Sequence, residues 1–125
     1  MTGVQTCALP IWLGPALADL ADRSTIPLDL HGDLAGRCPA ATETAAYVVI
    51  DESVRSAASR GASHVRIDVE RRNGTLNARI TDDGVRPAGP LTHLVDRAGA
   101  AGGRLVDMTD GPGLVLRLEI PCASS

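Results

Sequence analysis

Apolar residues recur along this chain with two different periods, and the change of period separates helices from strands. Ala46, Val49 and Ile50 begin a series spaced three and four residues apart, which is the spacing of one helix face. Elsewhere apolar and polar residues alternate, as in strands with one buried face. The expected elements are a helix over 13–23, a strand over 26–31, a helix over 42–60, strands over 64–70 and 76–81, a short helix from Leu91 to the stop at Gly102-Gly103, and strands over 105–108 and 114–120.

The order of these elements, α β α β β α β β, predicts the fold class. Asn73-Gly74 lies between two alternating runs and favours a tight β hairpin. Pro27 cannot donate a backbone hydrogen bond, so the first strand is expected at an edge or at its own start. We therefore expect an α+β fold, a two-layer α/β sandwich in which helices cover one face of an antiparallel or mixed sheet.

Composition narrows the class of protein. The 125 residues include 44% hydrophobic and 22% charged residues, which suits one globular domain. The net charge is −3 and every basic residue is an arginine, so the strongly basic surface of a sequence-independent nucleic-acid binder is absent. Trp12 and Tyr47 are the only aromatic residues, too few for base stacking. No apolar run approaches the roughly 20 residues that cross a bilayer, so we expect no membrane contact within this chain.

The cysteines number three, Cys7, Cys38 and Cys122, and none forms a CxxC pair. An odd number of scattered cysteines predicts neither a zinc site nor a disulfide framework. The simplest interpretation is reduced thiols in a cytoplasmic protein.

Segment 1–11 differs from the rest of the chain. It has no charge, no clear period and no signal-peptide pattern, and it resembles the translation of a sequencing-library adapter joined in frame near Trp12. A natural disordered N-terminus is the alternative. We expect the folded domain to span 12–122, followed by a tail over 123–125, and we expect that the original protein began further upstream.

Three groups of residues are candidates for chemistry. Glu52, Ser56 and Arg60 are four residues apart and form one line on the long helix, although such a line is most often a solvated face. The sequence 82–84, Asp-Asp-Gly, follows a strand and suits either a turn or a rigidly held carboxylate. The sequence 111–113, Gly-Pro-Gly, suits either a hairpin turn or a loop that approaches phosphates.

Taken in this order, the groups resemble the ATP-binding domain of sensor histidine kinases. The similarity covers about 13–122 and is strongest to actinobacterial kinases that pair with LuxR-type response regulators. It implies the GHKL, or Bergerat, fold, with ATP and Mg²⁺ held between the long helix, a lid segment and the sheet. It also implies a response regulator and a kinase dimerisation domain as partners in the full-length protein.

The adenine end of the implied site is largely retained. Asp82 matches the carboxylate that accepts the adenine N6 amine, and Gly84 matches the glycine after it, while the next family glycine is replaced by Arg86. Gly111 and Gly113 match the last glycine box, where the family threonine becomes Leu114.

The phosphate and metal end departs from the pattern. Glu52 matches the catalytic glutamate, but the Mg²⁺-binding asparagine is replaced by Ser56, so Glu52 and Ser56 would form only a weak metal site. Arg60 and Arg97 remain as candidate phosphate ligands. Two lid glycines become Pro90 and His93, which should crowd the triphosphate.

The resemblance therefore implies a kinase ATP-binding domain fragment with weak or absent catalysis. His31, His64 and His93 do not stand in the phosphoacceptor motif of the family, so this chain should not autophosphorylate. A second interpretation is an intact GHKL-like regulator, akin to an anti-sigma factor, that binds a partner without kinase activity. A third is a structural α+β domain in which the motif echoes arise by chance.

Overall fold

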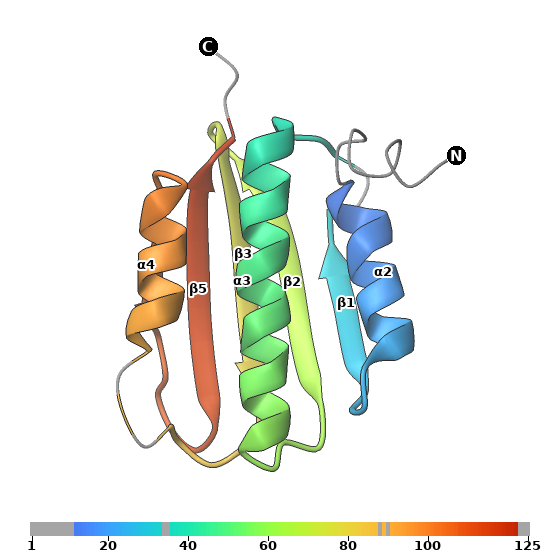
Figure 1. Cartoon of the computed structure of the whole chain (residues 1–125), viewed down its shortest axis with the longest axis vertical. Coiled ribbons are helices and arrows are strands. Elements are labelled where there is room, and N and C mark those ends of the chain that lie inside the picture. Colours follow the sequence, from blue (N-terminus) through green and yellow to red (C-terminus); the bar gives the residue numbers. More distant parts are fainter. Residues whose placement is uncertain (1–11, 34–35, 88, 90, 123–125) are drawn as a thin grey trace, which may run out of the picture.

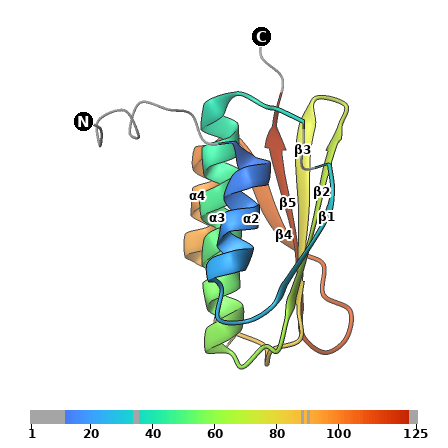
Figure 2. The same cartoon turned by 90° about the vertical axis from the view of Figure 1, so that its right-hand side faces the viewer.

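The computed structural model describes residues 12–33, 36–87, 89 and 91–122, and these form two layers (Figures 1 and 2). The predictions for segments 1–11 and 123–125 and for Pro90 concern residues outside the described ranges. Three helices lie against one face of a sheet of five described strands, which confirms the predicted α+β two-layer sandwich. The elements are α2 (Leu13–Arg23), β1 (Leu28–Gly32), α3 (Ala40–Ser59), β2 (Val65–Arg72), β3 (Thr75–Asp82), α4 (Thr92–Ala100), β4 (Arg104–Asp107) and β5 (Leu114–Pro121).

The sheet is mixed, with strand order β1-β2-β3-β5-β4. β1 runs parallel to β2, with Leu28 opposite Val65, and α3 makes the crossover between them. The remaining pairs are antiparallel. β1 lies at one edge, which confirms the expectation from Pro27.

The β2–β3 hairpin forms where the sequence predicts it. Asn73 has φ +53° and Gly74 has φ +71°, the positive values that a two-residue turn between twisted strands requires at both central positions. The turn fixes the register, so that Val65, Ile67 and Val69 all face the helices and are buried. A shift by one residue would turn these three side chains to solvent.

The core between the two layers is aliphatic. α3 contributes its buried stripe of Ala46, Val49 and Ile50, as its spacing predicts. The sheet contributes alternate residues of each strand, among them Ile67, Leu76, Ile80, Leu105, Leu116, Leu118 and Ile120, and the flanking helices add Leu13, Leu17, Leu20, Leu94 and Ala98.

Glu43 joins α2 to α3 and is fully buried. Its carboxylate accepts hydrogen bonds from the backbone N–H groups of Leu13 (2.8 Å) and Cys38 (2.6 Å) and from Nε of Arg37 (3.0 Å). The first of these satisfies one of the unpaired donors at the start of α2. Burial alone would raise the pKa of Glu43, but the two backbone hydrogen bonds and Arg37 outweigh it, so its pKa lies below the ordinary value.

Cys38 and Cys122 form a disulfide, and the expectation of reduced thiols is wrong for these two residues. Their separation of 84 positions gives no sequence signal, because they meet only after β5 has returned to the N-terminal end of α3. The Thr42 hydroxyl donates to the Pro121 carbonyl oxygen at 3.1 Å in the same region. The inference of a cytoplasmic compartment therefore loses the support it took from the cysteines. Cys7 lies outside the described residues.

None of the described helices has the length and apolar character to span a membrane.

Candidate functional site

Asp82 and Arg60 form a bidentate ion pair where β3 ends beside the C-terminal end of α3. Arg60 Nη1 donates to Oδ1 of Asp82 at 3.1 Å, and Nη2 donates to Oδ2 at 2.7 Å. Both side chains are nearly inaccessible to solvent, with 9% of Arg60 and 3% of Asp82 exposed. Asp82 is on the helix-facing side because it continues the inward alternation of Ala78 and Ile80.

Further contacts fix the guanidinium of Arg60. Its Nε donates to the Ser56 hydroxyl at 3.1 Å, and Nη1 also donates to the Val85 carbonyl oxygen at 2.8 Å. The Gly84 N–H donates to Oδ1 of Asp82 at 2.9 Å. Four of the predicted site residues, Ser56, Arg60, Asp82 and Gly84, therefore belong to one hydrogen-bonded group. Sequence spacing placed Ser56 beside Arg60, but it gave no sign that Arg60 would pair with Asp82.

Glu52 and Arg97 form a second ion pair, nearer the middle of α3. Arg97 Nε lies 2.5 Å from Oε2 of Glu52, and His93 Nε2 lies 4.0 Å from Oε1. His93 and Arg97 are one turn apart on α4, so both reach the same carboxylate. This pair connects the predicted lid helix to the long helix.

The described residues do not fit a magnesium site. Mg²⁺ requires near-octahedral oxygen ligands, whereas the Glu52 carboxylate is held by Arg97 and the Ser56 hydroxyl accepts from Arg60. Within the described part of the chain, no three His, Cys, Asp or Glu side chains gather in a way that could hold a metal ion.

The glycines of the candidate site differ in what surrounds them. A Cβ atom on Gly113 would lie 2.3 Å from the Asp82 carbonyl oxygen, and Gly113 has φ +85°. This glycine is therefore needed for close packing of β5 against the end of β3. Gly111 has φ +132° and open space around it, so only its backbone conformation favours glycine there. A Cβ on Gly84 would lie 3.1 Å from the Arg60 carbonyl oxygen, so Gly84 lets the β3 end approach α3.

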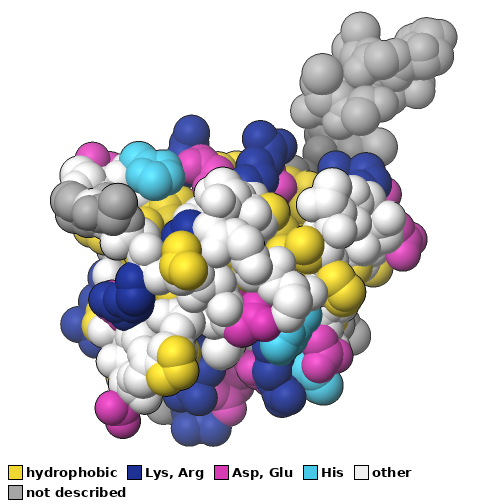
Figure 3. Space-filling model, turned by 90° about the horizontal axis from the view of Figure 1, so that it is seen from below, with side chains coloured by type: hydrophobic (Ala, Val, Ile, Leu, Met, Phe, Trp, Pro, Cys, Tyr) yellow, Lys and Arg dark blue, Asp and Glu magenta, His cyan; other side chains and the backbone are white. Residues whose placement is uncertain are grey.

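Asp83 has a turn-stabilising role that the sequence left open. Its carboxylate accepts from the Ser63 hydroxyl and from the backbone N–H groups of Ser63 (2.7 Å) and His64 (3.4 Å). The Ser63 hydroxyl is the main cause, and the Ser63 N–H the next, of a pKa lowered to about 2. Figure 3 views the molecule from this end and shows acidic, basic and histidine side chains intermixed with apolar ones.

A hollow of about 260 Å³ lies between α4, strands β4 and β5, and the residues Arg86, Pro87, Gly89 and Leu91 of the preceding loop. Leu91, Leu105 and Leu116 give it an apolar lining, and an ion pair of 3.3 Å between Arg86 and Asp107 closes one side. Asp82 is not among its lining residues. The predicted base-binding carboxylate and the nearby hollow are thus separate in this structure.

Comparisons with known proteins reveal the fold but no sequence relative. No protein-family model and no curated protein sequence matches the chain. Among solved structures, a blue-light-activated histidine kinase of Erythrobacter litoralis has a TM-score of 0.70 at 20% identity, over 94% of this chain and 43% of that chain. The ATP-binding domain of PrrB from Mycobacterium tuberculosis has a TM-score of 0.68 at 19% identity, over 93% of this chain and 98% of that chain.

A third neighbour is the histidine kinase domain of the E. coli osmosensor EnvZ, with a TM-score of 0.65 at 13% identity, over 94% of this chain and 92% of that chain. The chain thus spans nearly all of an isolated kinase ATP-binding domain and less than half of the longer photoreceptor kinase. The fold defined by α2 to β5 is the GHKL fold of histidine kinase ATP-binding domains. The nucleotide roles of the individual residues remain predictions.

Proposed function

We propose that this chain is the ATP-binding domain of a two-component sensor histidine kinase of the actinobacterial, LuxR-regulator-paired type, in which nucleotide binding is weak and phosphoryl transfer is lost. The observation that carries the proposal is the position of Asp82. In a fold shared with kinase ATP-binding domains, a buried carboxylate ends β3 and is oriented by the Gly84 N–H. In the full-length protein the domain would act with a dimerisation domain and a response regulator, on the cytoplasmic side of a sensor.

The acceptor sites of Asp82 are occupied or enclosed in this structure. A carboxylate offers about four lone-pair sites, and Arg60 Nη1, Arg60 Nη2 and the Gly84 N–H take three of them. The fourth, on Oδ2, is enclosed with the rest of the side chain. Adenine recognition therefore requires Arg60 to move, and we infer that the Arg60–Asp82 pair masks the base-recognition group.

The proposed loss of phosphoryl transfer follows from the residues at the phosphate and metal end of the site. Phosphoryl transfer depends on positioning the polyphosphate and neutralising its charge. The carboxylate of Glu52, the candidate catalytic residue, forms an ion pair with Arg97, and the Ser56 hydroxyl accepts a hydrogen bond from Arg60. In this proposal Arg97, Gly111 and Gly113 would border the phosphates, with Mg²⁺ contributing little to binding.

The test compares ADP with IDP, because inosine carries a carbonyl in place of the adenine N6 amine. Binding is measured by calorimetry and by thermal stabilisation, with and without Mg²⁺. We expect weak binding of ADP, still weaker binding of IDP, no dependence on Mg²⁺, and loss of ADP binding in Asp82→Asn. Equal or tighter binding of IDP, or ATP turnover at ordinary kinase rates, would overturn the proposal.

A second candidate function is a GHKL-like regulator, akin to an anti-sigma factor, that binds a partner protein without nucleotide. The ion pairs Arg60–Asp82 and Arg97–Glu52 favour it, because they satisfy the charged groups of the site without any ligand. Absence of ADP binding even in a variant with Asp82 unmasked, such as Arg60→Met, would favour this candidate over the first.

A further inference from the structure

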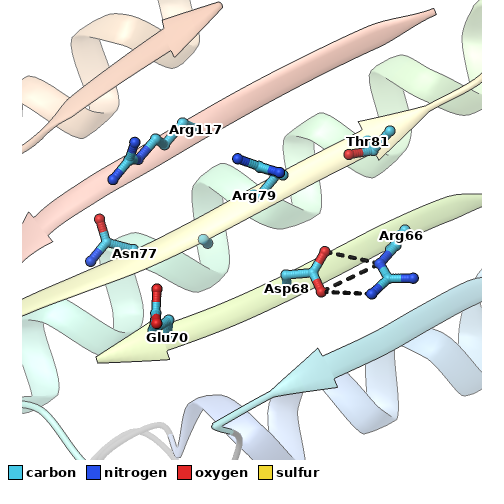
Figure 4. A pocket seen from close by; sticks show the side chains of 8 residues that line it. Arg66, Asp68, Glu70, Asn77, Arg79, Thr81 and Arg117 are labelled. Carbon is cyan, nitrogen blue, oxygen red and sulfur yellow. Dashed lines mark hydrogen bonds and ion pairs between the residues drawn. The ribbon is translucent and has the colours of Figure 1, made fainter. Parts of the chain in front are cut away.

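The face of the sheet that the helices leave uncovered carries a pair of arginines at its centre. Arg79 of β3 lies directly opposite Arg117 of β5 in the antiparallel register. The neighbours of both residues along their strands, among them Ala78, Ile80 and Leu116, are buried against the helices. The two arginines therefore point to the opposite side and are exposed, as Figure 4 shows.

Acidic residues on this face are already paired with arginines of the same strand or of a neighbouring strand. Asp68 is the cross-strand neighbour of Arg79 on β2, but Arg66 holds it through Nε at 3.0 Å and through Nη2 at 3.1 Å. Glu119 accepts from Arg117 at 3.0 Å and from Arg104 at 2.7 Å. Arg79 makes no hydrogen bond or ion pair with another described side chain.

This arrangement has an unbalanced charge at its centre. Like charges directly opposite each other on neighbouring strands destabilise a sheet. Here Arg79 and Arg117 line a shallow hollow of about 510 Å³ that Arg66, Asp68 and Glu70 also border, and the two carboxylates are paired with Arg66 and Arg72. The Thr81 hydroxyl and the Asn77 amide in the same lining can each donate a further hydrogen bond. Guanidinium groups match the planar, bidentate geometry of carboxylate and phosphate oxygens.

We propose that the hollow over Arg79 and Arg117 binds an oxyanion, a phosphate or carboxylate group, between the two guanidinium groups. The anion relieves the repulsion between the arginines and accepts a hydrogen bond from the Asn77 amide, which lies on the Arg117 side of Arg79 (Figure 4). The site lies on the face of the sheet opposite Asp82, so it is independent of the proposed nucleotide function.

The test is an NMR titration of the ¹⁵N-labelled full chain, which reports both backbone amides and arginine Nε–Hε groups. Sodium phosphate is added in one arm and sodium glutarate in another, each against sodium chloride at matched ionic strength. We expect saturable shifts at Arg79, Arg117 and Asn77. Saturation with phosphate alone assigns a phosphoryl ligand, and saturation with glutarate assigns a carboxylate.

Matched variants separate a site from general charge effects. Arg79→Gln should lower the anion affinity read from the shifts at Arg117 by about ten- to hundredfold, the loss expected for one charge-assisted hydrogen bond. Arg55→Gln removes an arginine of α3 that is paired with Asp51 at 3.2 Å, and it should leave the titration unchanged. Without anion, Arg79→Gln should melt no lower than the parent chain, since it removes a repulsion. Shifts that follow ionic strength alone, or that persist unchanged in Arg79→Gln, would overturn the proposal.

Discussion

Replacement of Arg60 by methionine is predicted to tighten ADP binding. Methionine keeps an unbranched stem but removes the guanidinium that holds both oxygens of Asp82. In the parent chain the adenine amine donates to one oxygen of Asp82 and must displace one of these two contacts, and each charge-assisted hydrogen bond contributes about 1.5–3 kcal/mol. Arg60 keeps its bonds to Ser56 and Val85, so the net cost of the displacement is that of one bond, about 1.5–3 kcal/mol. That cost corresponds to a gain of about ten- to hundredfold in affinity.

The sign of this effect distinguishes two roles of Arg60. If Arg60 contacts a phosphate, as the sequence suggests, Arg60→Met should weaken ADP binding. If it masks Asp82, the same change should strengthen it, and Arg60→Lys should give an intermediate gain because lysine cannot make the bidentate pair. Calorimetric titration with ADP measures all three proteins, with Arg55→Met, an exposed arginine of the same helix, as the control.

The variant also carries a stability cost that must be measured beside the affinity. Removing one partner of a buried ion pair typically costs about 3–5 kcal/mol, because the other charge is left uncompensated. The remaining Gly84 N–H bond to Asp82 should reduce this cost. Titrations are therefore made at a temperature where circular dichroism shows every variant folded. Weaker ADP binding in folded Arg60→Met, with Arg55→Met unchanged, would refute the masking role.

Three further predictions concern stability. Glu43→Gln should lower the free energy of unfolding at pH 7 by about 2–3 kcal/mol. Because the pKa of Glu43 is lowered in the folded chain, its stabilisation is complete above the ordinary glutamate pKa and is lost as pH falls through the folded value. The free energies of urea unfolding at pH 3 and pH 7 should therefore differ less in the variant than in the parent. Reduction of the disulfide and Cys38→Ser should each remove about 4.5 kcal/mol of stability on the chain-entropy estimate for a loop of 84 positions. Reductant should then have no effect on the melting temperature of Cys38→Ser. Gly113→Ala should destabilise the fold by about 1–3 kcal/mol, since its Cβ would meet the Asp82 carbonyl oxygen. Gly99→Ala, at a position in α4 with open space around it, should stabilise the fold by about 0.5–1 kcal/mol. Chemical unfolding of the two variants measures both changes.

The elements of the fold could be predicted because their signals are local. α2 begins and ends at the predicted residues, and the hairpin at Asn73-Gly74 fixes the register of two strands through backbone geometry alone. Strand order follows less directly, because the parallel pairing of β1 with β2 depends on how α3 packs across the sheet. The family resemblance predicted the GHKL fold, which periodicity alone could not, and the solved kinase domains confirm that fold.

The contacts at the candidate site could not be predicted from spacing. Arg60 and Asp82 are 22 positions apart, and their pairing depends on where the end of α3 lies relative to β3. Arg60 was expected to bind a phosphate and Asp82 the adenine amine, because no local pattern indicates that the two side chains meet. The Cys38–Cys122 disulfide and the buried Glu43 were missed for the same reason, since both depend on segments that meet only in the folded chain.

The attachment of α2 and β1 has a consequence for how the molecule opens. β1 is a five-residue edge strand bonded to β2 alone. α2 is joined to α3 by the Glu43 carboxylate, by a hydrogen bond from Arg23 Nη2 to the Tyr47 hydroxyl at 3.0 Å, and by its buried leucines. Because α2 and β1 lie at the edge of both layers, we expect them to detach as one cooperative segment before the β2–β3–β5 centre unfolds. In native-state hydrogen exchange, the amides before about residue 39 would then exchange faster than the amides of the sheet centre. Opening would expose the β2 edge to other chains, and the alternating charges of Arg66, Asp68 and Glu70 would protect that edge from aggregation.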